Sequence, residues 1–213
     1  ATFMLMGLIL RGVSFDFRAK VAQTEKKKWD TCFKYGSLLT TLSQRYMLGI
    51  WVTGLRTDLY AQGFALLSAF GVTAAYAFIG ACWLILKTEG DLQRKAFYWA
   101  KRCLMILAGG IIAVSFLNLT LHAEVRALWL ESPLGFLLMA IPVTCFGLLA
   151  LCGVVLQKLP EADGKGEWLP FALALLVFLL CFAAFGISYY PYVVPGKLTI
   201  MDALADANSL RFL

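Results

Sequence analysis

The 23 residues from Phe64 to Leu86 carry no formal charge, and this run constrains the fold more than any other feature of the chain. As a helix the run is about 34 Å long, enough to cross the hydrocarbon core of a bilayer. Hydrophobic residues make up 61% of the 213 residues and charged residues only 15%, which is far more apolar than a typical soluble domain. The sequence therefore predicts a polytopic all-α membrane protein with a single domain over residues 1–213.

Four more apolar segments follow the same pattern, and a short apolar run opens the chain. The six predicted segments are residues 1–10, 31–54, 64–86, 103–121, 133–157 and 169–189. The first would be only about 15 Å long as a helix, half of a bilayer, and no initiator Met or signal-peptide layout precedes it. We therefore expect a fragment of a longer chain, with residues 190–213 as a polar segment that leads towards a further span.

Lysine and arginine alternate between the predicted loops. The first, third and fifth loops, at residues 11–29, 87–102 and 158–165, carry thirteen of them, and the intervening loops carry four. The positive-inside bias predicts that the three cation-rich loops lie in the cytoplasm. The net charge of +6 is thereby explained, and nucleic acid is not an expected partner because no soluble domain is long enough to carry a basic patch.

The segment LILRGVSFDFR places Asp16 between Arg11 and Arg18 at the edge of the first apolar run. Charged side chains beside a bilayer are costly to leave unpaired, so they are functional candidates. If the helix continues through Gly12, both arginines share one face and Asp16 projects nearly opposite. Two roles stay open for Asp16: an ion pair with Lys20 or an arginine at the lipid headgroups, or an acid at the cytoplasmic entrance of a proton path.

The second predicted span contains a polar stripe and an arginine. Ser37, Thr41 and Gln44 recur at helical spacing, so we expect them to face protein. Arg45 lies beside them and requires an anion or a watery cavity. Its partner could come from another helix, another subunit or a cofactor carboxylate, or its side chain could extend to the periplasmic face. Asp58 is about 20 Å further along the helix and too far away to be that partner.

Ligands for redox metals are scarce. The chain has one histidine, His122, and six cysteines without a CxxC pair, whereas haem or transition-metal sites require such ligands to be clustered or opposed. We therefore predict no metal or haem bound by this chain, with His122 as an interface residue and the cysteines as small apolar side chains.

Two short polar motifs indicate local architecture. In KTEGD we expect Gly90 to adopt the unusual backbone angle of a turn, with Glu89 and Asp91 solvated or facing another subunit. Thr199 and Asp202 have the spacing of a capping box, which predicts a short interfacial helix.

Four stretches carry a resemblance that covers most of the chain in order: RGVSFDFR, SQRYMLGIWVTG, WLILKTEGDLQRKA and YYPYVVPGKLTIMDALADANSL. Together they resemble subunit II of the cytochrome bd-type quinol oxidases, including the cyanide-insensitive branch. The sequence departs from that family at two points. The early helices with their Trp-Asp-Gly region are absent, which fits a fragment that begins at the third helix, and Arg45 stands where we expect a small residue.

The resemblance implies a haem-free subunit of the bacterial inner membrane. Subunit I would bind the three haems, of types b and d, and the quinol, and would reduce dioxygen to water. This chain would contain no catalytic residue and would contact subunit I, membrane lipid and, through the complex, quinol. The resemblance matches Asp16 to an acid at a proton entrance, with Arg11 and Arg18 as flanking residues; Arg45 and Gln44 are interface candidates. A structural quinone or lipid in this subunit stays open.

Two alternatives belong to other functional classes. Six polar-striped spans would also suit half of a small-solute transporter, with Gly109 and Gly110 marking a helix break near a substrate site. A purely structural membrane anchor would differ from the oxidase subunit only in whether Asp16 transfers protons.

Overall fold

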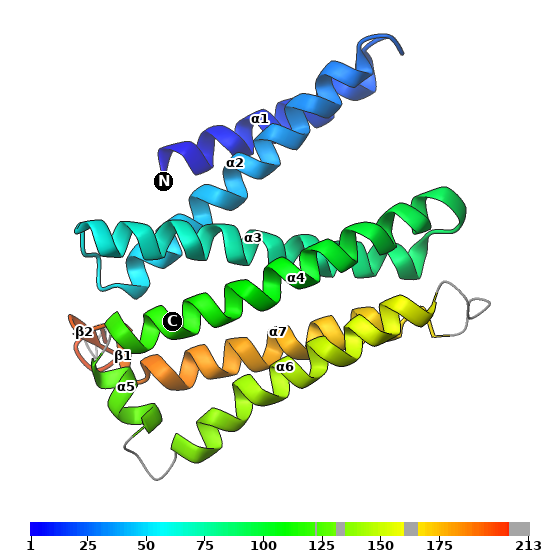
Figure 1. The fold of residues 1–213 in the computed structure, drawn as a ribbon. Coiled ribbons are helices and arrows are strands. Elements are labelled where there is room, and N and C mark those ends of the chain that lie inside the picture. The colour runs from blue at the N-terminus through cyan, green and yellow to red at the C-terminus, as the bar shows by residue number, and fades with distance from the viewer. Residues whose placement is uncertain (122, 131–134, 160–165, 205–213) are drawn as a thin grey trace.

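The structure is a computed structural model that describes residues 1–121, 123–130, 135–159 and 166–204 (Figure 1). Within these ranges the chain forms seven helices and one two-stranded antiparallel sheet. The elements are α1 (Thr2–Lys20), α2 (Lys26–Val52), α3 (Leu59–Lys87), α4 (Gly90–Leu121), α5 (Ala123–Leu130), α6 (Gly135–Lys158), α7 (Leu169–Tyr189), β1 (Tyr192–Val194) and β2 (Leu198–Thr199).

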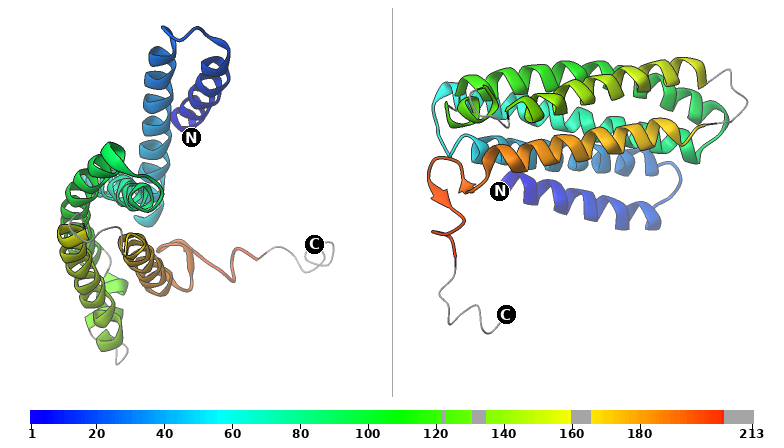
Figure 2. Two further views of the ribbon diagram at one scale, coloured as in Figure 1. Left: turned by 90° about the vertical axis from the view of Figure 1, so that its right-hand side faces the viewer. Right: turned by 90° about the horizontal axis from the view of Figure 1, so that it is seen from below.

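The six long helices form three antiparallel hairpins, α1–α2, α3–α4 and α6–α7, that lie side by side. Helix α3 connects them, because it contacts α2, α4 and α7. Figure 2 shows α1 at the edge of the assembly, packed against α2. The turns α1–α2 and α3–α4 and the adjacent ends of α6 and α7 all lie at one end, as the alternation of cations predicts. We call this the basic end; α5, the sheet and the α2–α3 turn lie at the opposite end.

Six long helices cover the six predicted segments, but several boundaries differ. Helix α7 has the predicted bounds. Helix α1 does not stop at Leu10; it continues through Gly12 to Lys20. Helix α4 begins at Gly90 and not at Cys103, so most of the predicted third loop is helical. The physical reason is that charged residues end the apolar part of a span without ending the helix, whose backbone hydrogen bonds are satisfied internally on either side of the membrane boundary.

Four of the helices are long and apolar enough to cross a membrane: α3, α4 over Gly90–Leu117, α6 over Leu138–Lys158, and α7. The chain is therefore an all-α membrane protein. Helices α1 and α2 are not in this group, because α1 carries several charged residues and α2 mixes polar with apolar residues along its length. Their crossing of the bilayer therefore stays a prediction. The short helix α5 lies in a segment that was expected to be a loop.

The main core lies among α3, α4, α6 and α7. Phe78, Ile85 and Leu156 are its largest fully buried aromatic and aliphatic side chains. All six cysteines are free thiols, and four of them are buried in this core. They pack as small apolar side chains, as the sequence analysis expected.

Glycines set how closely the helices approach. A Cβ atom on Gly49 of α2 would lie 2.5 Å from the Cα of Ala65 on α3, closer than real contacts allow. Small residues at such crossings are typical of membrane helices, whose association depends on close packing. In the KTEGD turn Gly90 has a φ of +68°, which confirms the predicted backbone role of this glycine.

The predicted capping box forms, but within a different element. The Thr199 amide and hydroxyl donate to Asp202 Oδ2 over 3.2 and 2.6 Å, and the Asp202 amide donates to Thr199 Oγ1 over 3.3 Å. Thr199 ends β2, and residues 200–203 form a turn rather than the predicted helix. The reciprocal bonds therefore close the end of a β-hairpin.

Substituting Gly49 with alanine is expected to lower the free energy of unfolding by about 1–3 kcal/mol, because the new methyl group meets backbone. The matched control is Gly63→Ala on α3, where a Cβ atom has no neighbour within 4 Å. Thermal unfolding of the full-length protein in detergent compares the two variants. Equal melting temperatures would contradict the proposed tight α2–α3 contact.

The Thr199–Asp202 turn is expected to depend on pH. The hydrogen bonds from the side chain and backbone of Thr199 hold the pKa of Asp202 below its ordinary value. A carboxylate with a lowered pKa stabilises the turn above its ordinary pKa, and this contribution is lost as the pH falls through the lowered value. Titration of the Asp202 carboxyl carbon by NMR checks this, and Thr199→Ala should return the midpoint towards the ordinary aspartate value.

Candidate functional site

The two arginines that bracket Asp16 both face α2. Because α1 is continuous through Gly12, Arg11 and Arg18 lie on one face of the helix. The guanidinium carbon of Arg11 lies 5.6 Å from the centre of the Phe33 ring. Arg18 Nε donates to Asp30 Oδ1 in an ion pair that joins α1 to α2. Both cations are therefore engaged by the neighbouring helix.

Asp16 lies on the opposite side of α1 and is exposed. It makes no hydrogen bond or ion pair with any residue that the structure describes, including Lys20 and the two arginines. It lies in the second-last turn of α1, where the negative end of the helix dipole disfavours an acid. Helix electrostatics and packing within this chain therefore give Asp16 no stabilising role.

The α1–α2 contact that positions Asp16 depends on small residues that the sequence analysis did not single out. A Cβ atom on Gly7 would lie 2.5 Å from Thr40 Oγ1. Ser14 is fully buried and its hydroxyl donates to the Leu10 carbonyl over 2.5 Å. The spacing of Gly36 and Thr40, two small residues four positions apart, is the signal that could have identified this interface.

One member of the polar stripe of α2, Thr41, is hydrogen-bonded within its own helix. The Thr41 hydroxyl donates to the Ser37 carbonyl over 2.8 Å, and both residues are half-buried. Gln44 is exposed. The expected protein-facing stripe is thus only partly buried by the described helices.

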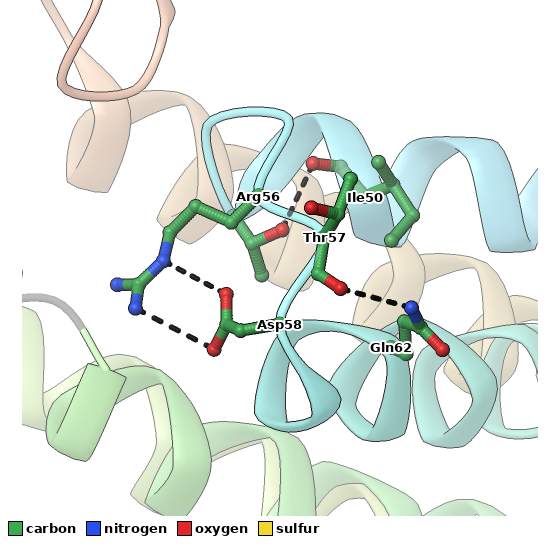
Figure 3. Close-up of polar contacts among 6 residues, drawn as sticks. Ile50, Arg56, Thr57, Asp58 and Gln62 are labelled. Carbon is green, nitrogen blue, oxygen red and sulfur yellow. Dashed lines mark hydrogen bonds and ion pairs between the residues drawn. The ribbon is translucent and has the colours of Figure 1, made fainter.

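Arg45 projects into the bundle. Its guanidinium carbon lies 4.4 Å from the centre of the Tyr76 ring on α3, within the range of a cation–π interaction. Arg45 Nε is buried and has no hydrogen-bond partner among the described residues. Asp58 is not its partner, because Arg56 binds this carboxylate through Nε and a terminal nitrogen, over 3.0 and 3.4 Å (Figure 3).

The sequence candidates therefore do not form one site. Arg11, Asp16 and Arg18 lie at the basic end of the α1–α2 hairpin. Gln44 and Arg45 lie near the other end of α2, about 28 Å from its first residue. The structure defines an acid with two engaged arginines at one end, and an unpaired arginine inside the bundle near the other.

Candidate metal ligands are spread through the described part of the chain. No three His, Cys, Asp or Glu side chains cluster there, and His122 lies outside the described residues. Helix α4 also runs unbroken through Gly109 and Gly110, so the helix break of the transporter interpretation is absent. A Cβ atom on Gly110 would lie 3.5 Å from the Cα of Gly71, an ordinary van der Waals distance, so this glycine lies at the contact between α3 and α4.

The helices and the two charged positions define a polytopic membrane protein with polar groups at both ends of a helical bundle. Residues 1–213 match the family model of cytochrome bd terminal oxidase subunit II, and the chain belongs to this family. It is 28% identical over 228 residues to cytochrome bd ubiquinol oxidase subunit 2 of Bacillus subtilis (strain 168). The match covers 97% of this chain and 61% of the relative. The resemblance found in the sequence is thereby confirmed.

The two acids at the basic end should differ in their effect on stability. Asp30→Asn removes the Arg18 ion pair, whose side chains are 50% and 51% exposed, and should cost up to about 1 kcal/mol. Asp16→Asn should leave the free energy of unfolding unchanged because no described partner is lost. Thermal unfolding of the full-length protein at low and high salt measures both effects. A larger loss for Asp16→Asn than for Asp30→Asn would show that Asp16 has a structural partner.

Proposed function

We propose that this chain is part of the haem-free subunit II of a respiratory quinol:oxygen oxidoreductase in the bacterial cytoplasmic membrane. Family membership supports an oxidase complex with haems and a partner subunit. In this proposal subunit I holds haems b and d and the quinol site, and this chain supports it. The chain also helps to deliver cytoplasmic protons, with Asp16 as the entry acid. Because the chain spans 61% of its relative, these properties concern the complete protein.

The observation that carries the proton-entry proposal is the exposed, unpaired carboxylate of Asp16. An acid that accepts protons from water must be accessible and must not be locked in an ion pair with a fixed arginine. Asp16 meets the second condition, because Arg11 and Arg18 are both engaged by residues of α2 and do not form an ion pair with it. They keep positive charge near Asp16 without neutralising it directly.

The face of α1 that carries Asp16 supports contact with another part of the complex. Leu5, Ile9, Gly12 and Asp16 share this face by helical spacing. Leu5 and Ile9 are 53% and 65% exposed, so further protein or lipid must cover this apolar strip in a membrane. Asp16 lies where the strip reaches the basic end. A proton taken up there would enter along the contact between α1 and the element that covers it.

The haems supply the redox chemistry of such a complex when bound, and dioxygen reduction consumes protons at that centre. The described residues of this chain offer no clustered ligand set for a metal. In this proposal their part is to position the entry acid, to keep it hydrated at the basic end, and to hold the α1–α2 hairpin against its neighbours. A structural quinone in this subunit is not required by this role.

The test is oxygen consumption with a quinol substrate by the full-length complex carrying Asp16→Asn, normalised to haem content. Loss of a general acid–base group typically lowers a rate by about 10²-fold or more when proton transfer limits turnover. We expect a large loss of turnover per haem in Asp16→Asn and partial recovery in Asp16→Glu. Haem content should not change.

The matched control is Asp91→Asn, which removes another exposed acid at the same end of the bundle, on α4. Its only described ion pair is an exposed one with Arg94, so turnover should stay at the wild-type level. Equal turnover in Asp16→Asn and the wild type would exclude the proton-entry role and favour a purely structural subunit. Equal losses in Asp16→Asn and Asp91→Asn would indicate a general surface-charge effect.

A further inference from the structure

A cavity of about 480 Å³, partly open to the surface of the bundle, is lined by α2, α3, α4, α5, α6 and α7. We call it the Arg45 cavity. Most of its wall is apolar, with Val72, Ile111 and Phe178 as examples. Its volume is within the usual range for small-molecule sites. An apolar ligand portion is therefore expected to occupy most of this space.

Among the described residues of this wall Arg45 is the charged one, and none of them is Asp or Glu. The guanidinium has the Tyr76 ring at 4.4 Å, and its buried Nε has no hydrogen-bond partner among the described residues. Two other polar groups of the wall are already bonded, since Trp129 Nε1 donates to Ser188 Oγ over 2.9 Å and Ser188 Oγ donates to the Ala184 carbonyl over 2.7 Å. Among the described residues, Arg45 Nε is the buried side-chain polar atom that lacks a hydrogen-bond partner.

An unpaired guanidinium at an apolar cavity is costly. An acceptor with negative charge would offset this cost, and planar donors such as guanidinium bind phosphate through two parallel hydrogen bonds. The same ligand must fill an apolar space. These two requirements together describe an amphiphile with an anionic oxygen headgroup.

The depth of Arg45 indicates the source of this amphiphile. Arg45 lies seven residues before Val52, the last residue of α2, which is about 10 Å along the helix. Trp51 and Trp129 lie at the same end, and tryptophan is enriched at the level of lipid headgroups. We propose that the Arg45 cavity binds one phospholipid of the adjacent leaflet, with its phosphate on Arg45 and an acyl chain among the apolar side chains.

This inference is independent of the proposed proton entry, since Asp16 lies at the other end of the α1–α2 hairpin. The full-length protein, with the subunits that copurify with it, is stripped of lipid by detergent exchange and titrated with dioleoyl phosphatidylglycerol. Native mass spectrometry counts the lipids bound to each complex. The wild type should retain one tightly bound phosphatidylglycerol, and Asp16→Asn should bind it equally well.

Substitution of Arg45 tests the headgroup contact. Arg45→Gln should weaken this binding by about tenfold or more, because hydrogen bonds to charged groups are lost. The lipid affinity of Arg45→Lys should lie between those of the wild type and Arg45→Gln, since lysine keeps the positive charge but lacks the two parallel donors of the guanidinium. Arg56→Gln is the matched control, because Arg56 is 60% exposed and binds Asp58, and it should not change lipid binding.

Gly71→Leu tests the acyl-chain contact with Arg45 intact. Gly71 lines the cavity, and a Cβ atom there would meet nothing within 4 Å, so a larger side chain can enter without backbone strain. This variant should also lose the lipid while the complex stays intact by size-exclusion chromatography. If Arg45→Gln does not assemble, Arg45→Lys and Gly71→Leu carry the test.

Three results would overturn the inference. The first is a wild-type complex that binds no phosphatidylglycerol, and the second is equal binding by the wild type and Arg45→Gln. The third is retention of oleic acid or of a quinone in place of the phospholipid, in parallel titrations with each. None of these results bears on the turnover of Asp16→Asn, so the lipid proposal and the proton-entry proposal can fail separately.

Discussion

The structure depends on one constraint: inside a bilayer every backbone hydrogen bond must be satisfied within its own segment. Long helices are the solution that this chain uses, and four of them are apolar enough to span. Burial of apolar surface gives little drive for helices to associate in lipid, because lipid tails are as apolar as leucine. Close backbone approach then becomes the main source of contact. Gly49 against Ala65 and Gly7 against Thr40 provide this approach at the two contacts of α2.

The bilayer also determines where charged side chains can lie. Lysine and arginine gather at the basic end, where water and lipid headgroups solvate them, and the described ion pairs are exposed. Asp16 and Arg45 are the informative residues because neither follows this pattern. Asp16 is unpaired although two arginines are near in sequence. Arg45 lies over the Tyr76 ring, and its Nε has no hydrogen-bond partner in the described part of the chain. An acid and an arginine that find no oppositely charged partner among the described residues, at opposite ends of one hairpin, favour two separate functions rather than one site.

Much of the fold could be predicted from the sequence. The bounds of α7 were predicted because its apolar run is preceded by Glu167 and Trp168 and followed by Tyr190 and Pro191. The start of α4 was missed because residues 90–102 are charged, and charge marks the membrane boundary but not the helix boundary. The α1–α2 interface was missed because attention went to Ser37, Thr41 and Gln44, whereas Gly36 and Thr40 are the residues that lie against α1.

The sequence by itself determined the class of protein, the number of long helices, their alternating direction and the family, because apolar length, cation position and short motifs are local properties. It also identified Asp16 and Arg45 as costly residues. Only the tertiary structure decided what surrounds them. Whether an arginine is paired depends on side chains from helices distant in sequence, such as Asp30 for Arg18 and Tyr76 for Arg45. The Arg45 cavity, likewise, exists only where six helices meet, and no local pattern encodes a space between them.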